Sequence, residues 1–426
     1  MIRTIITVSI ALAFSTGLTQ AATLTVRDCL RSAAEGNHTL KAAAFDERIA
    51  ADSVTIARSG FLPRVDFQGG YTSQLEPQKV SFIPGRILET QDANFGFFSL
   101  SIHQTVYDFG RTGMRTSRAG LLRDAASSDF TAREKDLFLR VVEAYYGILK
   151  ANSLLLAADD EVTQRQDHLR IAKALYEQGV VTRNDLLQAE VKLADSLQKK
   201  LAATNRVNNG WLQLNYLTGA PSDFRAELQQ EAPVEPATTE TDPVSHAWTH
   251  RPEITALNKL VQAGEEEVRE ADRAFYPEIF AKAGVDYVQN SKAVEQGIFA
   301  ATLGLRVNLY DGMATSSRKN QALKNLARQN EILRNAREQV RLELLTALND
   351  AGVAAERVKT VGKAIRQGEE NLRINRDRYA AQVGTATEVI DAQTLLTQIR
   401  TDYYRATFES QVAGARVKRA MGELKY

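Results

Sequence analysis

The sequence predicts an α+β chain that is mostly α-helical, in which long coiled-coil helices alternate with pairs of amphipathic strands. Three observations predict it: motifs that occur twice, segments in which apolar and polar residues alternate, and longer segments with heptad spacing. The 426 residues include 9 prolines and one cysteine, and 53 basic residues nearly balance 52 acidic ones. This composition excludes collagen-like, disulfide-framework and disordered chains, and it leaves no basic surplus that would attract nucleic acid.

The first 21 residues are predicted to be a secretory signal peptide. A basic start at Arg3 precedes an apolar stretch from Ile5 to Leu18, and cleavage is expected after Ala21. A membrane anchor is the alternative, but the stretch is short for a bilayer span. Cys29 does not follow a lipoprotein-type signal, and as the single cysteine it cannot form an internal disulfide. The mature chain is expected outside the cytoplasm of a bacterial cell.

Motifs recur at nearly constant separation, which indicates an internal duplication. Tyr107 and Tyr310 each begin a Tyr-Asp motif, and these two motifs are 203 residues apart. The turns that begin at Tyr176 and Tyr379 are also 203 residues apart. A Phe-x-Pro motif that ends at Pro63 recurs 214 residues later. The predicted units are a first structural repeat, residues 22–218, a connector rich in Pro, Thr and Glu, residues 219–242, and a second repeat, residues 243–426.

Each repeat is predicted to begin with one helix that stops just before a proline, and then to form two strands. The helices are expected at Leu24–Ser59 and Pro243–Phe275. The strands are expected at residues 65–71 and 98–106 in the first repeat and at residues 279–287 and 299–309 in the second. Each pair forms a hairpin, with residues 77–92 as the loop of the first.

The predicted strands have one apolar face and one polar face, and the polar face contains Lys282, Asp286 and Arg306. A small soluble sheet packed on helices is one interpretation. If the apolar face instead meets lipid, the sheet must close, because unpaired backbone groups are costly in hydrocarbon. Four strands cannot close, so two copies would give eight strands and three copies twelve, and a conduit that holds water favours three.

After each Tyr-Asp motif the apolar spacing changes to heptads with many small residues. The predicted long helices span residues 112–178 and 314–381, roughly 100 Å at about 1.5 Å per residue. In each repeat the two shorter helices total 72 residues, so they match the long helix when stacked end to end. The predicted seam positions include Phe138, Val142, Tyr145, Leu149, Asn152 and Leu156 in the first repeat, and Val389, Ala392, Leu396, Ile399, Tyr403, Ala406, Ser410 and Ala413 in the second.

This layout resembles that of the TolC-like outer-membrane efflux proteins over essentially the whole mature chain. The resemblance rests on the order and doubling of the motifs above and on an Arg-Pro-Glu helix start at Arg251. The second copy departs from the pattern at Gln382, where the first has Gly179. The resemblance implies a homotrimer whose twelve-strand barrel in the outer membrane continues into a twelve-helix periplasmic tunnel.

The same resemblance implies a passive export duct, the exit channel of a tripartite efflux pump or of a type I secretion system. Its implied partners are a periplasmic adaptor protein and an inner-membrane transporter that supplies the energy. The alternative function is a periplasmic coiled-coil scaffold or adaptor without a pore. The apolar faces of the strands favour the duct, because a scaffold has no use for a surface that can meet lipid.

The turns between the long helices and the helices that return from them are the candidate functional site. Thr182 and Thr385 each start a capping box, with Asp185 and Glu388 as the acids. Asp391 lies three residues beyond Glu388, on the same helical face. By resemblance, these three acids line the pore entrance, and Asp391 makes it cation-selective. The resemblance also assigns adaptor docking to Gly179, Val180, Val181, Thr182, Val383, Gly384 and Thr385, and gating to Tyr176 and Tyr379.

No motif predicts an enzyme, a cofactor or a metal site. His246 and His250 are four residues apart, but they precede Pro252 and are expected to straddle a helix start, which disfavours a metal pair. Asp108-Phe109-Gly110 matches a kinase triplet but ends a predicted strand and has no accompanying kinase motif. The chain has no Gly-Lys-Ser/Thr phosphate-binding loop, so the energy for transport must come from a partner.

Overall fold

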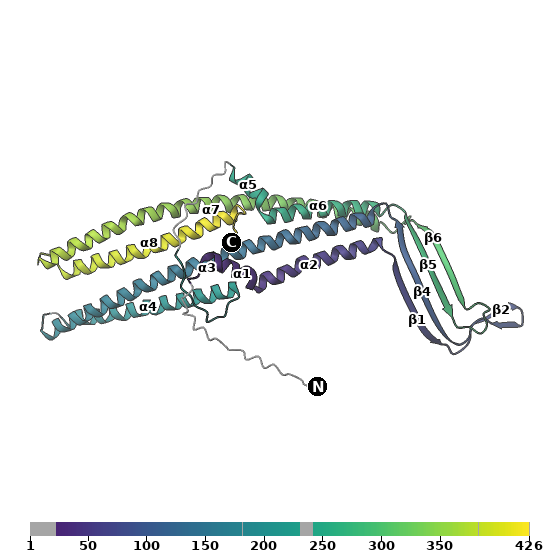
Figure 1. Ribbon diagram of the computed structural model, residues 1–426, viewed down its shortest axis with the longest axis horizontal. Coiled ribbons are helices and arrows are strands. Elements are labelled where there is room, and N and C mark those ends of the chain that lie inside the picture. Colours follow the sequence, from purple (N-terminus) through teal and green to yellow (C-terminus); the bar gives the residue numbers. More distant parts are fainter. Residues whose placement is uncertain (1–22, 181, 231–241, 382, 426) are drawn as a thin grey trace, which may run out of the picture.

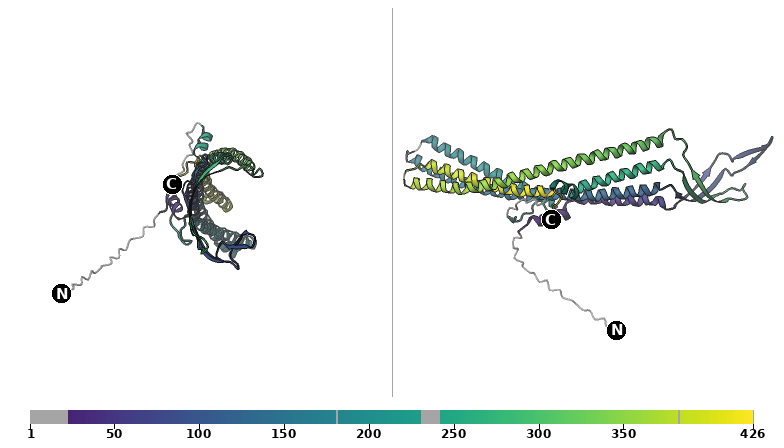
Figure 2. Two further views of the ribbon diagram at one scale, coloured as in Figure 1. Left: turned by 90° about the vertical axis from the view of Figure 1, so that its right-hand side faces the viewer. Right: turned by 90° about the horizontal axis from the view of Figure 1, so that it is seen from above.

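The computed structural model describes residues 23–180, 182–230, 242–381 and 383–425. The predicted signal peptide and most of the predicted connector lie outside these residues, as do Val181 and Gln382. The described chain is elongated, with a helical part that carries a twisted sheet at one end (Figure 1). Seen along the long axis, the helices and the sheet form an open arc, and α1, α5 and the C-terminus lie on its convex side (Figure 2).

Two long helices run through the helical part, α3 (Arg111–Glu177) and α7 (Ala314–Ala380), of 67 residues each. Shorter helices stack end to end beside them. Along α3 these are α2 (His38–Arg58) and α4 (Arg183–Thr218), and along α7 they are α6 (Pro252–Arg273) and α8 (Ala386–Ala420). Because α3 also contacts α6 and α8, the helices from the two halves of the chain form one continuous wall. This is the arrangement that the helix lengths predict. None of the described helices has the length and apolar character that a membrane span requires.

The first helix predicted in each repeat is divided into two shorter helices, so the prediction of a single helix there was wrong. In the first repeat α1 (Val26–Gly36) ends at Asn37, whose side-chain oxygen accepts from the Leu40 amide at 3.0 Å and so starts α2. In the second, α5 (Pro243–His250) ends at Arg251, which is extended at φ −78° and ψ 121°. A residue before proline avoids the helical region, so Pro252 begins α6 instead.

In both halves of the chain, a glycine that ends a long helix hairpin packs closely against the end of the first short helix. Gly219 ends α4 with φ +73°, and a Cβ there would lie 2.6 Å from the Gly36 carbonyl oxygen at the end of α1. Gly422, just after α8, has φ +79°, and its Cβ would lie 2.6 Å from the His250 carbonyl oxygen at the end of α5. Both positions require glycine because of the backbone angle and because of the space.

The sheet contains the four predicted strands in the order β1 (Arg64–Ser73), β4 (Asn94–Tyr107), β5 (Glu278–Val288) and β6 (Gly297–Arg306), and all neighbours are antiparallel. The last strand ends at Arg306 rather than at the predicted residue 309. Inside the predicted loop 77–92 the structure has a separate hairpin of β2 (Lys79–Ile83) and β3 (Arg86–Glu89). Its turn contains Gly85 at φ +86°, a backbone angle that favours glycine.

The register confirms the two predicted faces of the sheet. One row across all four strands consists of Phe67, Leu100, Val285 and Phe299, and the next row on the same face consists of Val65, Ile102, Ala283 and Ala301. The opposite face contains a row of Arg64, His103, Lys282 and Thr302. Most apolar side chains of β1, β4 and β6 are exposed to solvent in the single chain, with Phe299 at 86% and Leu303 at 75%. No helix covers this apolar face (Figure 1).

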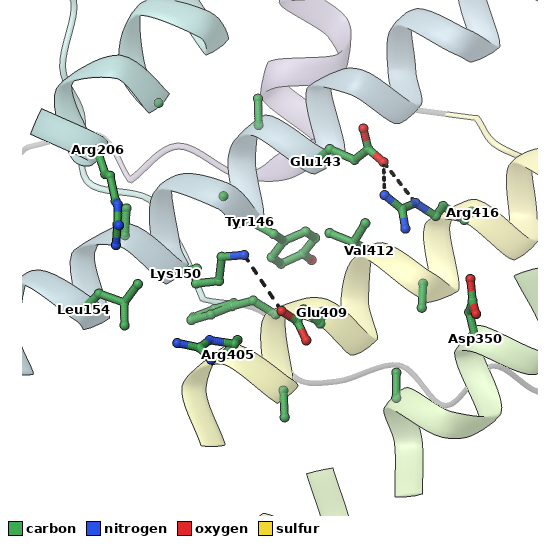
Figure 3. A pocket seen from close by; sticks show the side chains of 18 of the residues that line it. Glu143, Tyr146, Lys150, Leu154, Arg206, Asp350, Arg405, Glu409, Val412 and Arg416 are labelled. Carbon is green, nitrogen blue, oxygen red and sulfur yellow. Dashed lines mark hydrogen bonds and ion pairs between the residues drawn. The ribbon is translucent and has the colours of Figure 1, made fainter. Parts of the chain in front are cut away.

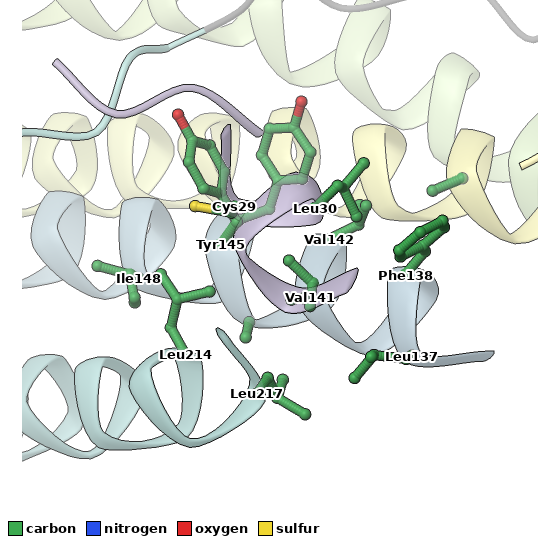
Figure 4. Close-up of a cluster of buried hydrophobic side chains, with 14 of the residues drawn as sticks. Cys29, Leu30, Leu137, Phe138, Val141, Val142, Tyr145, Ile148, Leu214 and Leu217 are labelled. Atoms are coloured by element: carbon green, nitrogen blue, oxygen red, sulfur yellow. The ribbon is translucent and has the colours of Figure 1, made fainter. Parts of the chain in front are cut away.

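The largest buried cluster lies where α1 packs on α3 and α4 (Figure 4). Phe138, Val142, Tyr145 and Leu149 are buried there, as their seam positions predict. Leu156 is 68% exposed, so that seam prediction was wrong, because a straight helix drifts about 20° per heptad away from a strict seam. The seam of α8 is buried at Ala392, Leu396, Ala406, Ser410 and Ala413. Cys29 belongs to the α1 cluster, and burial raises the pKa of its thiol to about 12.

A cluster of ion pairs around two buried arginines joins α3, α6, α7 and α8 at mid-length. Arg419 is 7% exposed and lies 2.6 Å from an oxygen of Asp136 and 3.2 Å from one of Glu253. Arg251 is 4% exposed and lies 2.5 Å from Glu253 and 2.6 Å from Glu343. Since these partners come from four helices, the cluster fixes the two halves of the chain relative to each other.

Candidate functional site

The turn between α3 and α4 forms the first helix tip. Gly179 has a φ of +70°, and the Val180 amide donates to the Leu175 carbonyl at 2.9 Å, which ends α3. The Thr182 hydroxyl accepts from the Asp185 amide at 3.3 Å, and the Asp185 carboxylate accepts from the Thr182 amide at 2.9 Å. The predicted capping box is therefore present. The hydrogen bonds from Thr182 lower the pKa of the Asp185 carboxyl.

The turn between α7 and α8 forms the second tip and is built in the same way. The Val383 amide donates to the Arg378 carbonyl at 3.0 Å, and Gly384 leads into the cap of α8. The Thr385 hydroxyl accepts from the Glu388 amide at 3.3 Å, and the Glu388 carboxylate accepts from the Thr385 amide at 3.1 Å. Arg378 lies 3.8 Å from that carboxylate, so a positive charge of the same chain already faces Glu388.

Two apolar side chains are exposed at the tips, Val180 at 66% and Val383 at 68%. The other described residues predicted to dock an adaptor are exposed or half-buried: Gly179, Thr182, Gly384 and Thr385. One exposed valine at each tip is not a contiguous apolar patch, so these side chains alone do not identify a protein-binding surface. Adaptor docking at these tips stays a prediction.

The three predicted pore acids differ in their surroundings. Asp185 and Glu388 accept the hydrogen bonds of the two caps. Asp391 is exposed one turn further along α8, and within the described residues its carboxylate takes part in no ion pair or hydrogen bond. Tyr176 is 39% exposed in the last turn of α3, and the side chain of Tyr379 lies outside the described part of the chain. The pore and gate assignments remain predictions, with Asp391 the acid most available to a pore.

A groove of about 1090 Å³ lies between the α3–α4 and α7–α8 hairpins (Figure 3). All four helices line it, and α3 and α8, which contact each other, form its floor. Tyr145 of α3 is fully buried against α1, whereas Glu143 and Gly147, two positions to either side, line the groove. Side chains two positions apart on a helix point in directions that differ by about 160°. The groove therefore opens on the side of α3 opposite to α1, which is the concave side of the arc.

A family model described as "Outer membrane efflux protein" matches residues 29–220 and 244–423. The chain belongs to this family. The two matched segments leave out only the N-terminal segment, nearly all of the predicted connector and the last residues. An outer membrane efflux protein lies in the outer membrane and extends into the periplasm, so the predicted localisation is confirmed. The family is one of channel proteins rather than of enzymes.

Relatives of this efflux protein include secretion and efflux proteins. The chain is 20% identical to the alkaline protease secretion protein AprF of Pseudomonas aeruginosa, over 87% of this chain and 78% of that protein. It is 22% identical to the outer membrane protein TolC of Escherichia coli, over 91% of this chain and 80% of TolC. The crystal structure of the Campylobacter jejuni CmeC outer membrane channel superimposes with a TM-score of 0.81 at 16% identity, covering 93% of this chain and 85% of CmeC. The fold of this efflux protein is therefore that of a TolC-like channel.

The histidine pair of the efflux protein is packed differently from the prediction. His246 and His250 both lie inside α5 rather than across a helix start, because the helix begins at Pro243. Their rings stack 3.9 Å apart, and His246 lies 2.9 Å from Glu423. In the described residues no three His, Cys, Asp or Glu side chains are grouped so that they could hold a metal ion.

Two features of the efflux protein were not found from the sequence. The groove combines side chains of four helices that are far apart in the chain, so no local motif marks it. The cluster of ion pairs includes Arg251 and Glu253, which the sequence marks only as a helix start. Its other members, Arg419, Asp136 and Glu343, lie in heptad segments where charges are common, so their pairing leaves no local signal.

Proposed function

We propose that three copies of this chain close into a passive export duct through the outer membrane. The observation that carries the proposal is the sheet with one apolar face and two open edges. In the described residues β1 and β6 each pair on one side only. Because the order β1-β4-β5-β6 alternates in direction, β6 of one copy can pair antiparallel with β1 of the next. Three sheets of four strands give a closed barrel of twelve, with the apolar face toward lipid.

The arc of the helices supports the same assembly. In each half of the helical part, two helices from each repeat stand side by side in the wall, and the wall curves in the same sense as the sheet (Figure 2). Three such arcs make a tunnel twelve helices in circumference that continues the barrel. A scaffold without a pore is less well supported, because nothing in the described chain would cover the apolar face of its sheet.

The partners follow from the shape and from the names of the relatives. AprF is named for protease secretion, and the family for efflux, so the cargo is either a secreted protein or small molecules. The chain has no phosphate-binding loop, so an inner-membrane transporter supplies the energy. A periplasmic adaptor binds the exposed helix tips. We place the strand loops outside the cell and the helix tips in the periplasm.

Labelling of intact cells tests this orientation. A Val294→Cys variant is expected to react with a membrane-impermeant maleimide on intact cells, because Val294 is 98% exposed in the loop between β5 and β6. A Val383→Cys variant, at a helix tip, is expected to react only after the outer membrane is permeabilised. Cys29 should give little background, since its thiol is buried and its pKa is about 12. Labelling of Val383→Cys but not of Val294→Cys on intact cells would invert the proposed orientation.

Single-channel recording tests both the pore and its acids. Purified protein in a planar bilayer is expected to conduct, and an Asp391→Ala variant is expected to lose cation preference by roughly twofold or more, because three like charges at a narrow entrance attract cations. Gln188→Ala, at the corresponding position of the first repeat, is the neutral control and should leave the reversal potential unchanged. An Asp391→Ala channel with the wild-type reversal potential would show that Asp391 lies off the pore. The absence of any conductance would refute the duct itself.

A further inference from the structure

The groove on the concave side of the helical wall carries an excess of positive charge. Its lining includes five basic side chains and three acidic ones. The basic residues are Lys150, Arg206, Arg357, Arg405 and Arg416, and the acidic residues are Glu143, Asp350 and Glu409. The excess within the lining is therefore two positive charges in each copy of the chain. Outside the groove, Asp402 lies 3.4 Å from Arg405 and offsets part of it.

The charges are unevenly distributed along the groove. Glu143 pairs with Arg416 at 2.7 Å, and Glu409 lies 3.3 Å from Arg357 and 4.0 Å from Lys150. Arg206 of α4 is exposed and has no ion pair within the described chain. Figure 3 shows Arg206, Lys150 and Arg405 on one side of the groove, with Glu409 beside Lys150 and with Asp350 on the far side. One side of the groove is therefore electropositive.

Apolar side chains accompany these charges. Tyr146, Leu154, Phe408 and Val412 also line the groove, and Tyr146 and Leu154 lie on the electropositive side (Figure 3). Tyr146 and Phe408 are only 4% and 3% exposed, so the apolar surface open to a ligand comes mainly from the half-buried Leu154 and Val412. Basic side chains next to an apolar surface are suited to an anion that also carries a ring.

The polar face of the sheet is balanced in charge, because Arg64, Lys282 and Arg306 share it with Asp66, Glu278 and Asp286. Lys282 stands in one row with His103 and Arg64, and no acid shares that row. Arg306 lies over the Phe280 ring at 5.1 Å, and His103 tilts against the same ring at 5.8 Å. Asp66 offsets part of this charge through its 2.9 Å contact with Arg64. The surface that would face the barrel lumen therefore has cations beside an aromatic ring but no positive excess, so the excess is confined to the groove.

We propose that the groove is a transit-binding site for small organic anions that carry an aromatic ring. This inference rests on the proposed function, in which the concave side is the inner wall of the duct. Each assembled duct contains three such grooves, and an anion released into the tunnel binds between Arg206 and Arg405 before it moves on toward the barrel. The positive charge at this level raises the local concentration of anionic cargo in a water-filled passage.

The test uses the purified full chain and pyranine, a fluorescent pyrene trisulfonate that is too hydrophilic to enter detergent micelles. Binding is measured by fluorescence anisotropy at low salt. An Arg206→Gln/Arg405→Gln variant is expected to bind roughly fivefold or more weakly than the wild type, because two charges that face the ligand are removed. The matched control is Arg27→Gln/Arg31→Gln, which removes two exposed charges from α1 on the convex side. It is expected to bind pyranine as the wild type does.

The possible outcomes distinguish a failure of the proposed binding site from a failure of the proposed duct. Equal weakening in both double variants, or no weakening in either, would overturn the groove as a binding site, whereas conductance in planar bilayers would leave the duct standing. Groove-dependent binding by a protein that does not conduct would instead refute the duct and keep the site. All three proteins should show the same circular-dichroism melting curve, since the replaced side chains are exposed or, for Arg405, half-buried on helix surfaces.

Discussion

A Phe299→Lys variant is expected to fail to accumulate in the outer membrane. Phe299 is 86% exposed in the single chain and lies in one row with Val285 and Leu100 on the apolar face of the sheet. If that face meets lipid, each lysine near the bilayer midplane costs about 2–4 kcal/mol, and every copy in the assembly carries one. The measurement is the amount of protein in outer-membrane fractions, with the heat-modifiable band of unheated samples as the readout for assembly.

The neighbouring residue provides the control. Ala300 points to the opposite face of the same strand, which also contains Asp66 and Lys282. An Ala300→Lys variant is expected to assemble at nearly the wild-type level, because its lysine would lie in water. If both variants assembled equally well, the apolar face would not meet lipid, and a soluble scaffold would become the better interpretation.

An Arg419→Met variant is expected to lose about 1.5–3 kcal/mol of the free energy of unfolding, the range for hydrogen bonds to charged groups. Methionine replaces the length of the side chain but not its charge, and it leaves the carboxylates of Asp136 and Glu253 without the arginine that lies 2.6 and 3.2 Å from them. The loss exceeds that of an exposed pair because the side chain of Arg419 is only 8% exposed and that of Glu253 27%. Asp136 is 49% exposed and contributes less. It can be measured by urea unfolding of the purified protein in detergent, followed by circular dichroism.

Arg416→Met is the matched control, one turn earlier on α8. Arg416 also pairs with an acid, Glu143 at 2.7 Å, but its side chain is 52% exposed. An exposed pair of this kind contributes less than about 1 kcal/mol, so this variant should unfold close to the wild type. Equal losses in the two variants would show that burial of the Arg419 cluster does not matter.

The pH dependence of the free energy of unfolding is a second test of the ion pairs around Arg419. Burial raises the pKa of Glu253, but Arg419 and Arg251 outweigh it, and the net pKa lies below the ordinary value of 4.5. A lowered folded-state pKa contributes stability above pH 4.5 that is lost as the pH falls through the folded value. The wild type should therefore lose stability below pH 4.5, and Glu253→Gln should lose less over that range.

The sequence by itself determined the features that repeat at short range or along the chain. Alternation assigned Phe299 and Lys282 to opposite faces, and the register agrees. Heptad spacing predicted the long helices to within one residue at each end, because period and length are local properties. The caps at Thr182 and Thr385 were readable for the same reason, since a capping box spans only four residues.

Only the tertiary structure decided the features that depend on contacts between distant segments. Asn37 breaks the first helix while its side chain also donates to the Leu217 carbonyl at 3.0 Å, a partner 180 residues away. The hairpin of β2 and β3 was hidden in a loop too short and irregular to show a strand period. The groove and the Arg419 cluster each combine four helices, and the charge on a side chain does not reveal whether it will be buried. Burial is decided by which surfaces meet, and that depends on the packing of the whole chain.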